Sequence, residues 1–181
     1  MKKIMFALAV GLIALGAQAN YIKWSVSTTA SSTYYSSSAN LSSFTAYLIE
    51  ESDWTGKAAD LANAVASASW ATSKDTGSAR QYKTANPVTS ETAMTTGDYN
   101  FYVILSDGNQ YWASSAQVGT VYEAGSTDPN NKSVSLSFSG ASAITTASLQ
   151  TLSDAGGVPE PTSGLLLLVG GAMLALRRRQ K

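Results

Sequence analysis

Cysteine and histidine are both absent from this sequence of 181 residues. Without cysteine there can be no disulfide bond and no thiolate nucleophile, so the fold must rest on its hydrophobic core alone. Without histidine there can be no Ser-His-Asp triad, and the two absences together exclude the usual His/Cys metal clusters. A glycine-rich phosphate loop is also missing, because both Gly-Gly pairs lie near the carboxyl terminus. We therefore predict no cofactor.

The side chains that remain for chemistry are carboxylates, serines, lysines and tyrosines. A carboxylate pair such as Glu50 and Asp98 would suit glycoside hydrolysis, but acids beside turns are more often solvated strand ends. Residues 128–131, Asp-Pro-Asn-Asn, offer oxygen ligands without the spacing or the distal glutamate of a calcium loop, so they predict an Asx-type turn. We predict no catalytic residue, no metal site and no enzyme; a small carboxylate-dependent hydrolase stays a minor alternative.

The amino-terminal segment has the three parts of a secretory signal peptide. Two lysines at positions 2 and 3 precede an apolar core at residues 4–15, and Ala17 and Ala19 form a small-x-small cleavage site. Cleavage after Ala19 would make Asn20 the first residue of the mature protein. We therefore predict a signal peptide at residues 1–19 and export of the mature chain.

The carboxyl-terminal segment combines a tripeptide, an apolar stretch and a basic end in a fixed order. Pro159, Glu160 and Pro161 precede an apolar stretch, predicted as a transmembrane helix at about residues 163–176, and an arginine cluster follows directly (Arg177, Arg178 and Arg179). The fifteen residues from Thr162 to Leu176 reach only about 22 Å as a helix, against a hydrocarbon core of about 30 Å. The arginines extend this reach and hold their end in the cytoplasm by the positive-inside rule, so everything between the two terminal segments must lie outside the inner membrane.

The order of these parts over residues 158–181 resembles the PEP-CTERM sorting signal of Gram-negative bacteria. The resemblance implies that an exosortase, an integral-membrane cysteine transpeptidase, is a transient partner that cuts near the Pro-Glu-Pro. It implies an inner-membrane location before processing and the cell envelope or the extracellular space afterwards. The same tail is sometimes labelled after ice-binding proteins, but the regular Thr-x-Thr ladders of an ice-binding face are absent here.

Without its two terminal segments the chain is acidic and rich in hydroxyl groups. Residues 20–158 contain six basic and eleven acidic side chains, a net charge of −5, and 43 of their 139 residues are serine or threonine. An acidic surface disfavours nucleic acid and anionic lipid as partners. The length predicts one exported β-rich domain at residues 20–152, followed by a linker at residues 153–157.

Alternation of apolar and polar residues predicts several strands. It is clearest at residues 133–139, where Val134, Leu136 and Phe138 alternate with four serines, as in a strand with one face in water. The other predicted strands lie at residues 22–26, 44–49, 101–105 and 118–122. Residues 28–40 and 72–97 predict loops, with short edge strands at Tyr82 and Val88, and residues 139–157 predict a linker that can add a last strand.

Two local signals refine this pattern. Alanine-rich spacing at residues 57–70 predicts the only helix, which Asp53 or Thr55 can cap. Asp107 and Gly108 between two β-prone runs predict a two-residue hairpin turn, with Ile104 opposite Tyr111 and Val103 opposite Trp112. The fold class is therefore mainly β: a single antiparallel β-sandwich-like domain with one helical insertion, flanked by a signal helix and a transmembrane helix.

The function predicted from these features is that of a non-catalytic exported surface or extracellular-matrix protein, such as a component of a biofilm, sorted by an exosortase. The main alternative is a carbohydrate-binding module of the extracellular polysaccharide matrix. Trp24 and Trp112 lie in strand patterns and predict core positions, whereas Tyr34 and Tyr35 lie in a serine-rich loop and predict an exposed aromatic platform for sugars.

Overall fold

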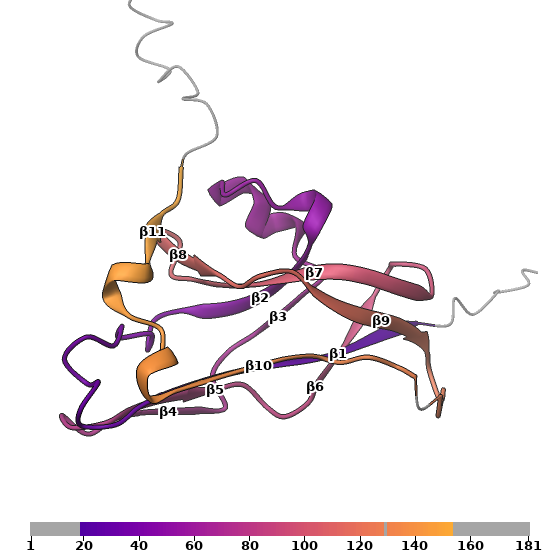
Figure 1. Ribbon diagram of the computed structural model, residues 1–181. Helices are drawn as coiled ribbons and strands as arrows, with labels where there is room; N and C mark the ends of the chain where they lie inside the picture. The colour runs from indigo at the N-terminus through magenta and orange to yellow at the C-terminus, as the bar shows by residue number, and fades with distance from the viewer. Residues whose placement is uncertain (1–18, 129, 154–181) are drawn as a thin grey trace, which may run out of the picture.

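The structure is a computed structural model that describes residues 19–128 and 130–153, and the fold is mainly β (Figure 1). The described part contains eleven strands and four short 3-10 helices. The strands are β1 (Asn20–Ala30), β2 (Thr45–Glu50), β3 (Ala66–Ala68), β4 (Thr72–Asp75), β5 (Arg80–Lys83), β6 (Val88–Thr92), β7 (Gly97–Ser106), β8 (Gln110–Ala113), β9 (Gln117–Glu123), β10 (Val134–Ser139) and β11 (Gln150–Thr151). The 3-10 helices are η1 (Glu51–Asp53), η2 (Ala58–Asn63), η3 (Gly140–Ser142) and η4 (Thr146–Ser148).

The eleven strands form one hydrogen-bonded sheet that curls until its two halves face each other (Figure 1). In the lower half of the view β1 is central, with β6 and β5 along one edge and β10 along the other. In the upper half β7 is central, with β2 along one edge and β8 and β9 along the other. Strand β9 also pairs with the start of β1, so it joins the two halves.

The prediction of a mainly β, antiparallel fold is confirmed, with one exception among the strand pairs. β10 runs parallel to β1, in register from Trp24 opposite Val134 to Thr29 opposite Ser139. The two halves also do not form the separate sheets of a sandwich, because β9 is hydrogen-bonded to both β1 and β7. The result is a curled sheet rather than two stacked ones.

Apolar side chains from both halves meet in one core. Trp24 of β1, Leu48 of β2 and Phe101 of β7 are each 0% exposed and belong to the same cluster. Trp112 is partly buried against this cluster, where its ring meets Phe138 edge-on at 5.1 Å between centroids. The predicted core position is therefore confirmed for Trp24, whereas Trp112 is only partly buried at the edge of the core.

The predicted helix at residues 57–70 is wrong over most of its length. Only η2 is helical, as a 3-10 helix, and the alanine-rich end of the segment forms β3, which pairs with β2 and places Ala66 opposite Leu48. A short isolated helix is marginal in water, whereas small side chains allow β3 to pack closely as an edge strand. The segment of η1 and η2 folds over the outer side of β2 and β7, where Ile49 and Ile104 are fully buried (Figure 1).

Five predicted strands are confirmed, and one region contains more strands than its sequence predicts. Residues 22–26, 44–49, 101–105, 118–122 and 133–139 fall in β1, β2, β7, β9 and β10. Residues 72–97 contain β4, β5 and β6. The short edge strands predicted at Tyr82 and Val88 are confirmed as β5 and β6, which both pair with β1. β4 is not predicted, because its residues are polar and mostly exposed.

The hairpin between β7 and β8 exists, but its turn lies one residue later than predicted, so each β7 residue faces a partner two residues further along β8. Leu105 lies opposite Trp112 and Ile104 opposite Ala113, so the two turn residues are Gly108 and Asn109. Gly108 takes a φ of +91°, and glycine at the first central position is typical of a type II′ turn. Asp107 is therefore the residue before the turn, where its carboxylate accepts hydrogen bonds from the amides of Asn109 and Gln110.

Candidate functional site

The residues predicted for export and sorting lie almost entirely outside the described part. This holds for Ala17 and for the sorting motif with its basic end, which comprise Pro159, Glu160, Pro161, Arg177, Arg178 and Arg179. Ala19 is the first described residue, and Asn20, directly after the predicted cleavage point, begins β1. Among the described residues no helix is long and apolar enough to cross a membrane, and the predicted transmembrane segment lies beyond them.

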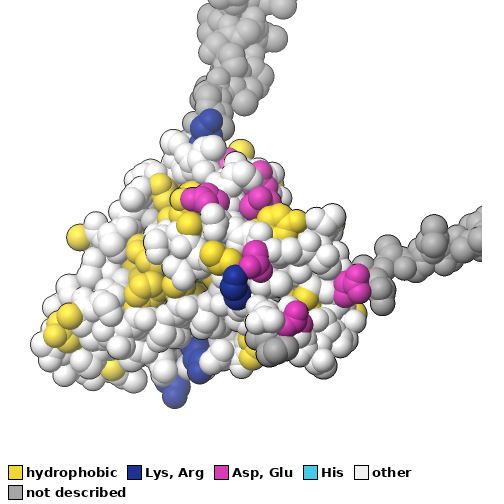
Figure 2. Space-filling view, turned by 45° about the vertical axis from the view of Figure 1, so that its right-hand side comes forward, with side chains coloured by type: hydrophobic (Ala, Val, Ile, Leu, Met, Phe, Trp, Pro, Cys, Tyr) yellow, Lys and Arg dark blue, Asp and Glu magenta, His cyan; other side chains and the backbone are white. Residues whose placement is uncertain are grey.

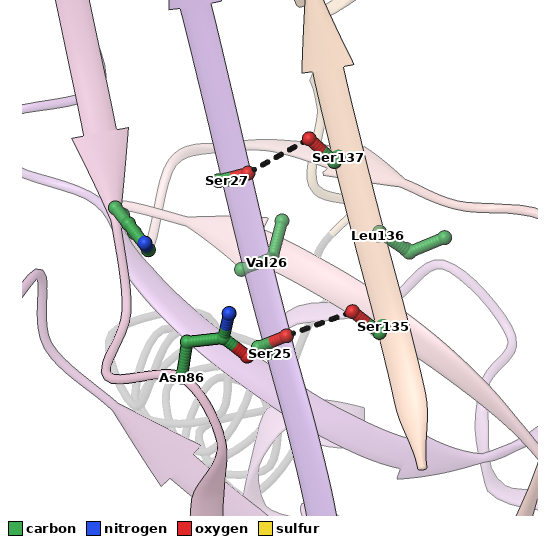
Figure 3. Close-up of a pocket in the computed structure, with 8 residues that line it drawn as sticks. Ser25, Val26, Ser27, Asn86, Ser135, Leu136 and Ser137 are labelled. Atoms are coloured by element: carbon green, nitrogen blue, oxygen red, sulfur yellow. Dashed lines mark hydrogen bonds between the residues drawn. The ribbon is translucent and has the colours of Figure 1, made fainter. Parts of the chain in front are cut away.

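The outer side of β1 and β10 carries paired serines, which we call the serine face. Parallel pairing in register places Ser25 beside Ser135 and Ser27 beside Ser137, and their hydroxyl oxygens lie 3.0 and 3.1 Å apart (Figure 3). These pairs border a shallow hollow of about 180 Å³ together with Asn86. Because the hydroxyl groups bind each other across the strands, the serine face stabilises the parallel pair and offers few free groups to a ligand.

Three lysines project from the same outer side: Lys23, Lys74 and Lys83. Register places Lys83 beside Ser27, and none of the three forms a salt bridge with another described residue. On the face that Figure 2 shows, the side chains along the lower edge are basic, whereas acidic and basic side chains are mixed in the centre and upper half. The described part therefore carries lysines on the outer side of the lower half, although acidic residues such as Asp75 and Glu91 also lie on lower-half strands.

A second hollow, lined mainly by polar groups, lies at the end of the molecule where β2 begins and β7 ends. We call it the loop-end groove; its volume is about 530 Å³. Phe44 and Leu149 supply apolar surface, and polar groups come from the loop before β2, from β5 and from the β7–β8 turn, namely Ser36, Ser38, Asn40, Ser42, Ser43, Arg80, Asp107 and Gln110.

Asn40 is fixed in the loop-end groove by its side-chain oxygen. Oδ1 accepts hydrogen bonds from the amide of Ser42 at 3.1 Å, from the Ser42 hydroxyl at 2.8 Å and from the Tyr82 hydroxyl at 2.9 Å. Three donors on one atom identify it as the oxygen, so the orientation of the amide is determined by the network. The Nδ2 group has no hydrogen-bond acceptor among the described residues, so it presents two donors at a defined position.

Asp107 is fixed in the complementary way. Its Oδ1 accepts the amides of Asn109 and Gln110 at 2.9 and 2.8 Å, which leaves Oδ2 without a donor among the described residues. The hydrogen bond from the Gln110 amide, with that from Asn109, outweighs partial burial and lowers the pKa of Asp107 below its ordinary value. The carboxylate is therefore ionised at neutral pH and acts only as an acceptor.

Arg80 borders the same groove, but its guanidinium group already binds other residues of the protein. Its Nε donates to Asp75 at 2.9 Å, one terminal nitrogen donates to the Ser38 carbonyl, and the guanidinium lies 4.4 Å from the centre of the Tyr35 ring. The hydrogen bond to Asp75 raises the pKa of Arg80 further, so its charge is permanent. Arg80 thus connects β5 to the loop rather than offering a free cation.

The carboxylates considered for hydrolysis do not form a pair in one hollow. Glu50 borders a hollow with Asp53 and Glu91, but Asp98 does not line it. Asp98 binds Lys132 and the Thr120 hydroxyl, each at 2.6 Å, and the hydrogen bond from Lys132 is the main cause of its lowered pKa. Asp98 cannot act as a general acid at neutral pH in this arrangement, because it is already deprotonated.

The remaining candidates behave mainly as structural groups. Tyr34 is exposed, but the Tyr35 hydroxyl donates to Asp75 and its ring packs under Arg80, so the two tyrosines do not form one open platform. The Asp128 carboxylate accepts the amide of Asn130 at 2.8 Å, as in the predicted Asx-type turn. Among the described residues no group of three acidic side chains is placed to hold a metal ion.

The loop-end groove has almost no signal in the sequence. Asp107 stands out there only as a residue of the hairpin turn, and Asn40 has no predicted binding role. The one available signal is an Asn-x-Ser order at residues 40–42, which is the order of an Asx turn as well as of a glycosylation acceptor. Comparison of the chain with protein-family models, with curated proteins and with solved structures finds no match in any of the three.

Proposed function

We propose that this chain is a non-catalytic exported protein of the cell surface or extracellular matrix, sorted by an exosortase. One observation supports this best: the folded domain occupies the interval between the two predicted targeting segments. β1 begins at Asn20, next to the predicted cleavage point, and the last strand ends at Thr151. In this proposal a signal helix at residues 1–19 and a transmembrane helix at about residues 163–176 flank the domain.

The surface chemistry supports a non-catalytic role. Four carboxylates of the described part are hydrogen-bonded in turns, as at Asp107 and Asp128, or neutralised by cations, as at Asp75 and Asp98. The small-hydrolase alternative needs two carboxylates converging in one pocket, and Glu50 and Asp98 do not line a common hollow. The loop-end groove supports the carbohydrate-binding alternative. It contains two fixed polar groups, Asn40 Nδ2 and Asp107 Oδ2, that have no hydrogen-bond partner among the described residues.

The intact mass of the protein, taken from the cell envelope and culture fluid of a host that has the sorting enzyme, tests the proposal. We expect the chain to begin at Asn20 and to stop near Pro159, without the arginine cluster. Glu160→Ala should leave the uncut form in the inner membrane, because the span remains while recognition is lost. Replacing the three arginines by serine should instead weaken membrane retention, because no positive charges then keep this end of the helix on the cytoplasmic side.

Glu123→Ala is a matched control, because it removes a carboxylate from the exposed end of β9 rather than from the sorting motif. It should be processed like the natural chain. Secreted or envelope protein that still carries Lys181 would overturn the sorting proposal and make the segment a plain anchor. Retention of Met1 would remove the argument for export.

A further inference from the structure

We propose that the loop-end groove binds a neutral saccharide, with the Asn40 amide as hydrogen-bond donor and the Asp107 carboxylate as acceptor. The inference rests on the proposed function for the setting in which the ligand is met, an extracellular polysaccharide, and on the groove itself for its chemistry. The ligand class is determined by three features: the position of the two groups, their fixed orientation and the balance of charge around them.

The topology places the two groups at one end of the curled sheet. Thr45 at the start of β2 pairs with Ser106 at the end of β7, so the turn that precedes β2 and the turn that follows β7 are neighbours. Asn40 lies in the first turn and Asp107 in the second, and both line the loop-end groove. Residues far apart in the sequence therefore face one hollow.

Both groups are fixed before any ligand arrives. The Oδ1 atom of Asn40 accepts one backbone amide and two hydroxyl groups, and that of Asp107 accepts two backbone amides. These bonds orient the other atom of each group, Asn40 Nδ2 or Asp107 Oδ2, which stays free of them. Tyr82 strengthens the arrangement at Asn40, because its own side chain is buried to 1% exposure in the core. Fixed polar groups lower the entropic cost of binding, because little side-chain freedom remains to be lost.

A donor and an acceptor that line one hollow match the chemistry of a saccharide, which carries several hydroxyl groups. Each sugar hydroxyl both donates and accepts, so one can receive from Asn40 while another donates to Asp107. Leu149 provides apolar surface for the C–H face of the ring, and the volume of about 530 Å³ lies within the range of ligand sites. The serines at the rim add further hydroxyl partners.

The charges favour a neutral saccharide over an acidic one. The ionised Asp107 carboxylate repels an anionic ligand, and Arg80 is occupied by Asp75 and the Ser38 carbonyl. The exposed Tyr34 is not among the lining residues, so binding depends on hydrogen bonds rather than on stacking over an aromatic ring. We therefore expect a dissociation constant of about 1 mM for a single site, with tighter retention by a polymer.

Affinity electrophoresis of the full chain, purified in mild detergent, tests the inference. Native gels contain a neutral polysaccharide (dextran, mixed-linkage β-glucan or galactomannan) or an acidic one (alginate). We expect retardation in at least one neutral gel and none in alginate. Asn40→Asp keeps the Oδ1 acceptor but removes both donors, and Asp107→Asn keeps the turn but replaces the free acceptor, so each should weaken retardation at least about tenfold.

Asp128→Asn is the matched control, since Asp128 also caps a turn through Oδ1 but lies outside the groove. It should be retarded like the natural chain. No retardation in any neutral gel, or equal retardation of both groove variants and the natural chain, overturns the inference. Retardation in alginate alone also overturns the inference, because it would indicate that the lysines beside the serine face bind an acidic polysaccharide. The sorting proposal is tested separately by the intact mass, so either can fail without the other.

Discussion

Gly119 of β9 lies where the strand passes between the two halves of the curled sheet. A methyl group at this position would lie 2.7 Å from Val134 Cγ2, 3.1 Å from Phe101 Cδ2 and 3.2 Å from Ile22 Cδ1. These three side chains belong to β10, β7 and β1, so the absence of a side chain at Gly119 allows three strands to pack closely. The requirement is for space and not for an unusual backbone conformation, because φ at Gly119 is not positive.

We expect Gly119→Ala to lower the free energy of unfolding by about 1–3 kcal/mol, because the added methyl group overpacks the core. Urea unfolding of the variant measures this loss. The double variant Gly119→Ala/Val134→Ala is the internal control, since it removes the closest contact. Its loss should be smaller than the sum of the two single losses; strict additivity would show that the methyl group is accommodated elsewhere.

Asp60 is a buried carboxylate held by its neighbours in sequence. Its Oδ2 accepts the Thr55 amide at 2.7 Å, the Thr55 hydroxyl at 2.9 Å and the Lys57 amide at 3.0 Å. Burial by itself raises the pKa of Asp60, but these hydrogen bonds outweigh it, and the pKa lies below its ordinary value. A lowered pKa in the folded state means that the charged carboxylate stabilises the fold.

The contribution of Asp60 is therefore present above its unfolded-state pKa of about 4 and is lost as the pH falls through the lower folded-state pKa. We expect Asp60→Asn, whose oxygen can accept the same three hydrogen bonds, to flatten the fall in stability below about pH 4. Asp60→Ala should lower stability at neutral pH as well. Thermal unfolding at several pH values measures both effects. If Asp60→Asn keeps the full pH dependence, other carboxylates dominate it.

At the scale of elements, the loop between β1 and β2 is ordered by partners that lie far along the chain. The Trp70 indole nitrogen donates to the Leu41 carbonyl at 2.7 Å, and Leu41 itself is 0% exposed. Arg80 and Tyr82 bind the same loop at Ser38 and Asn40. The loop has no apolar period because its conformation is fixed by these individual hydrogen bonds rather than by a regular buried face.

We expect Trp70→Phe to cost about 1–2 kcal/mol, because it removes the hydrogen bond to Leu41 and some packing. Chymotrypsin should then cleave at Tyr34 or Tyr35 faster than in the natural chain. Trp54→Phe is the matched control, since Trp54 packs against Tyr111 away from this loop. Equal cleavage rates in the two variants would mean that Trp70 does not order the loop.

The sequence predicts those strands in which apolar and polar residues alternate regularly, so that one face is buried. β10 alternates strictly between core residues and serines, so its position could be predicted, whereas its parallel pairing with β1 depends on a distant strand and could not. The segment at residues 57–70 has helical spacing, but pairing with β2 determines the structure of its second half. The loop-end groove was beyond prediction because Asn40 and Asp107 meet only after β2 and β7 have paired.

At the scale of the whole molecule, η1, η2 and the end of the described chain lie together on one half of the curled sheet. Ser153, the last described residue, lies on the upper side of the sheet, where it bridges to Lys57 beside η2. The carboxylates of η1 lie in the same region. Lys23, Lys74 and Lys83, on the same side as the serine face, project from the opposite, lower half.

One core shared by both halves should make unfolding a single cooperative event. Val26 of β1 and Leu48 of β2 are both 0% exposed and lie in the same cluster, although they belong to opposite halves. We therefore expect Val26→Ala and Leu48→Ala each to lower the midpoint of one common transition, with losses of about 1–5 kcal/mol. Calorimetry of the full chain in mild detergent measures this.

The same calorimetric scans should be unchanged by a reductant, because the chain has no cysteine. They should also be unchanged by a chelator, because no group of acidic side chains in the described part is placed to hold a metal ion. Two separate transitions, one moved by Val26→Ala and the other by Leu48→Ala, would show that β9 does not couple the halves. A large loss of stability in chelator would instead reveal a cation bound by carboxylates, which would contradict the view that the core alone holds the fold together.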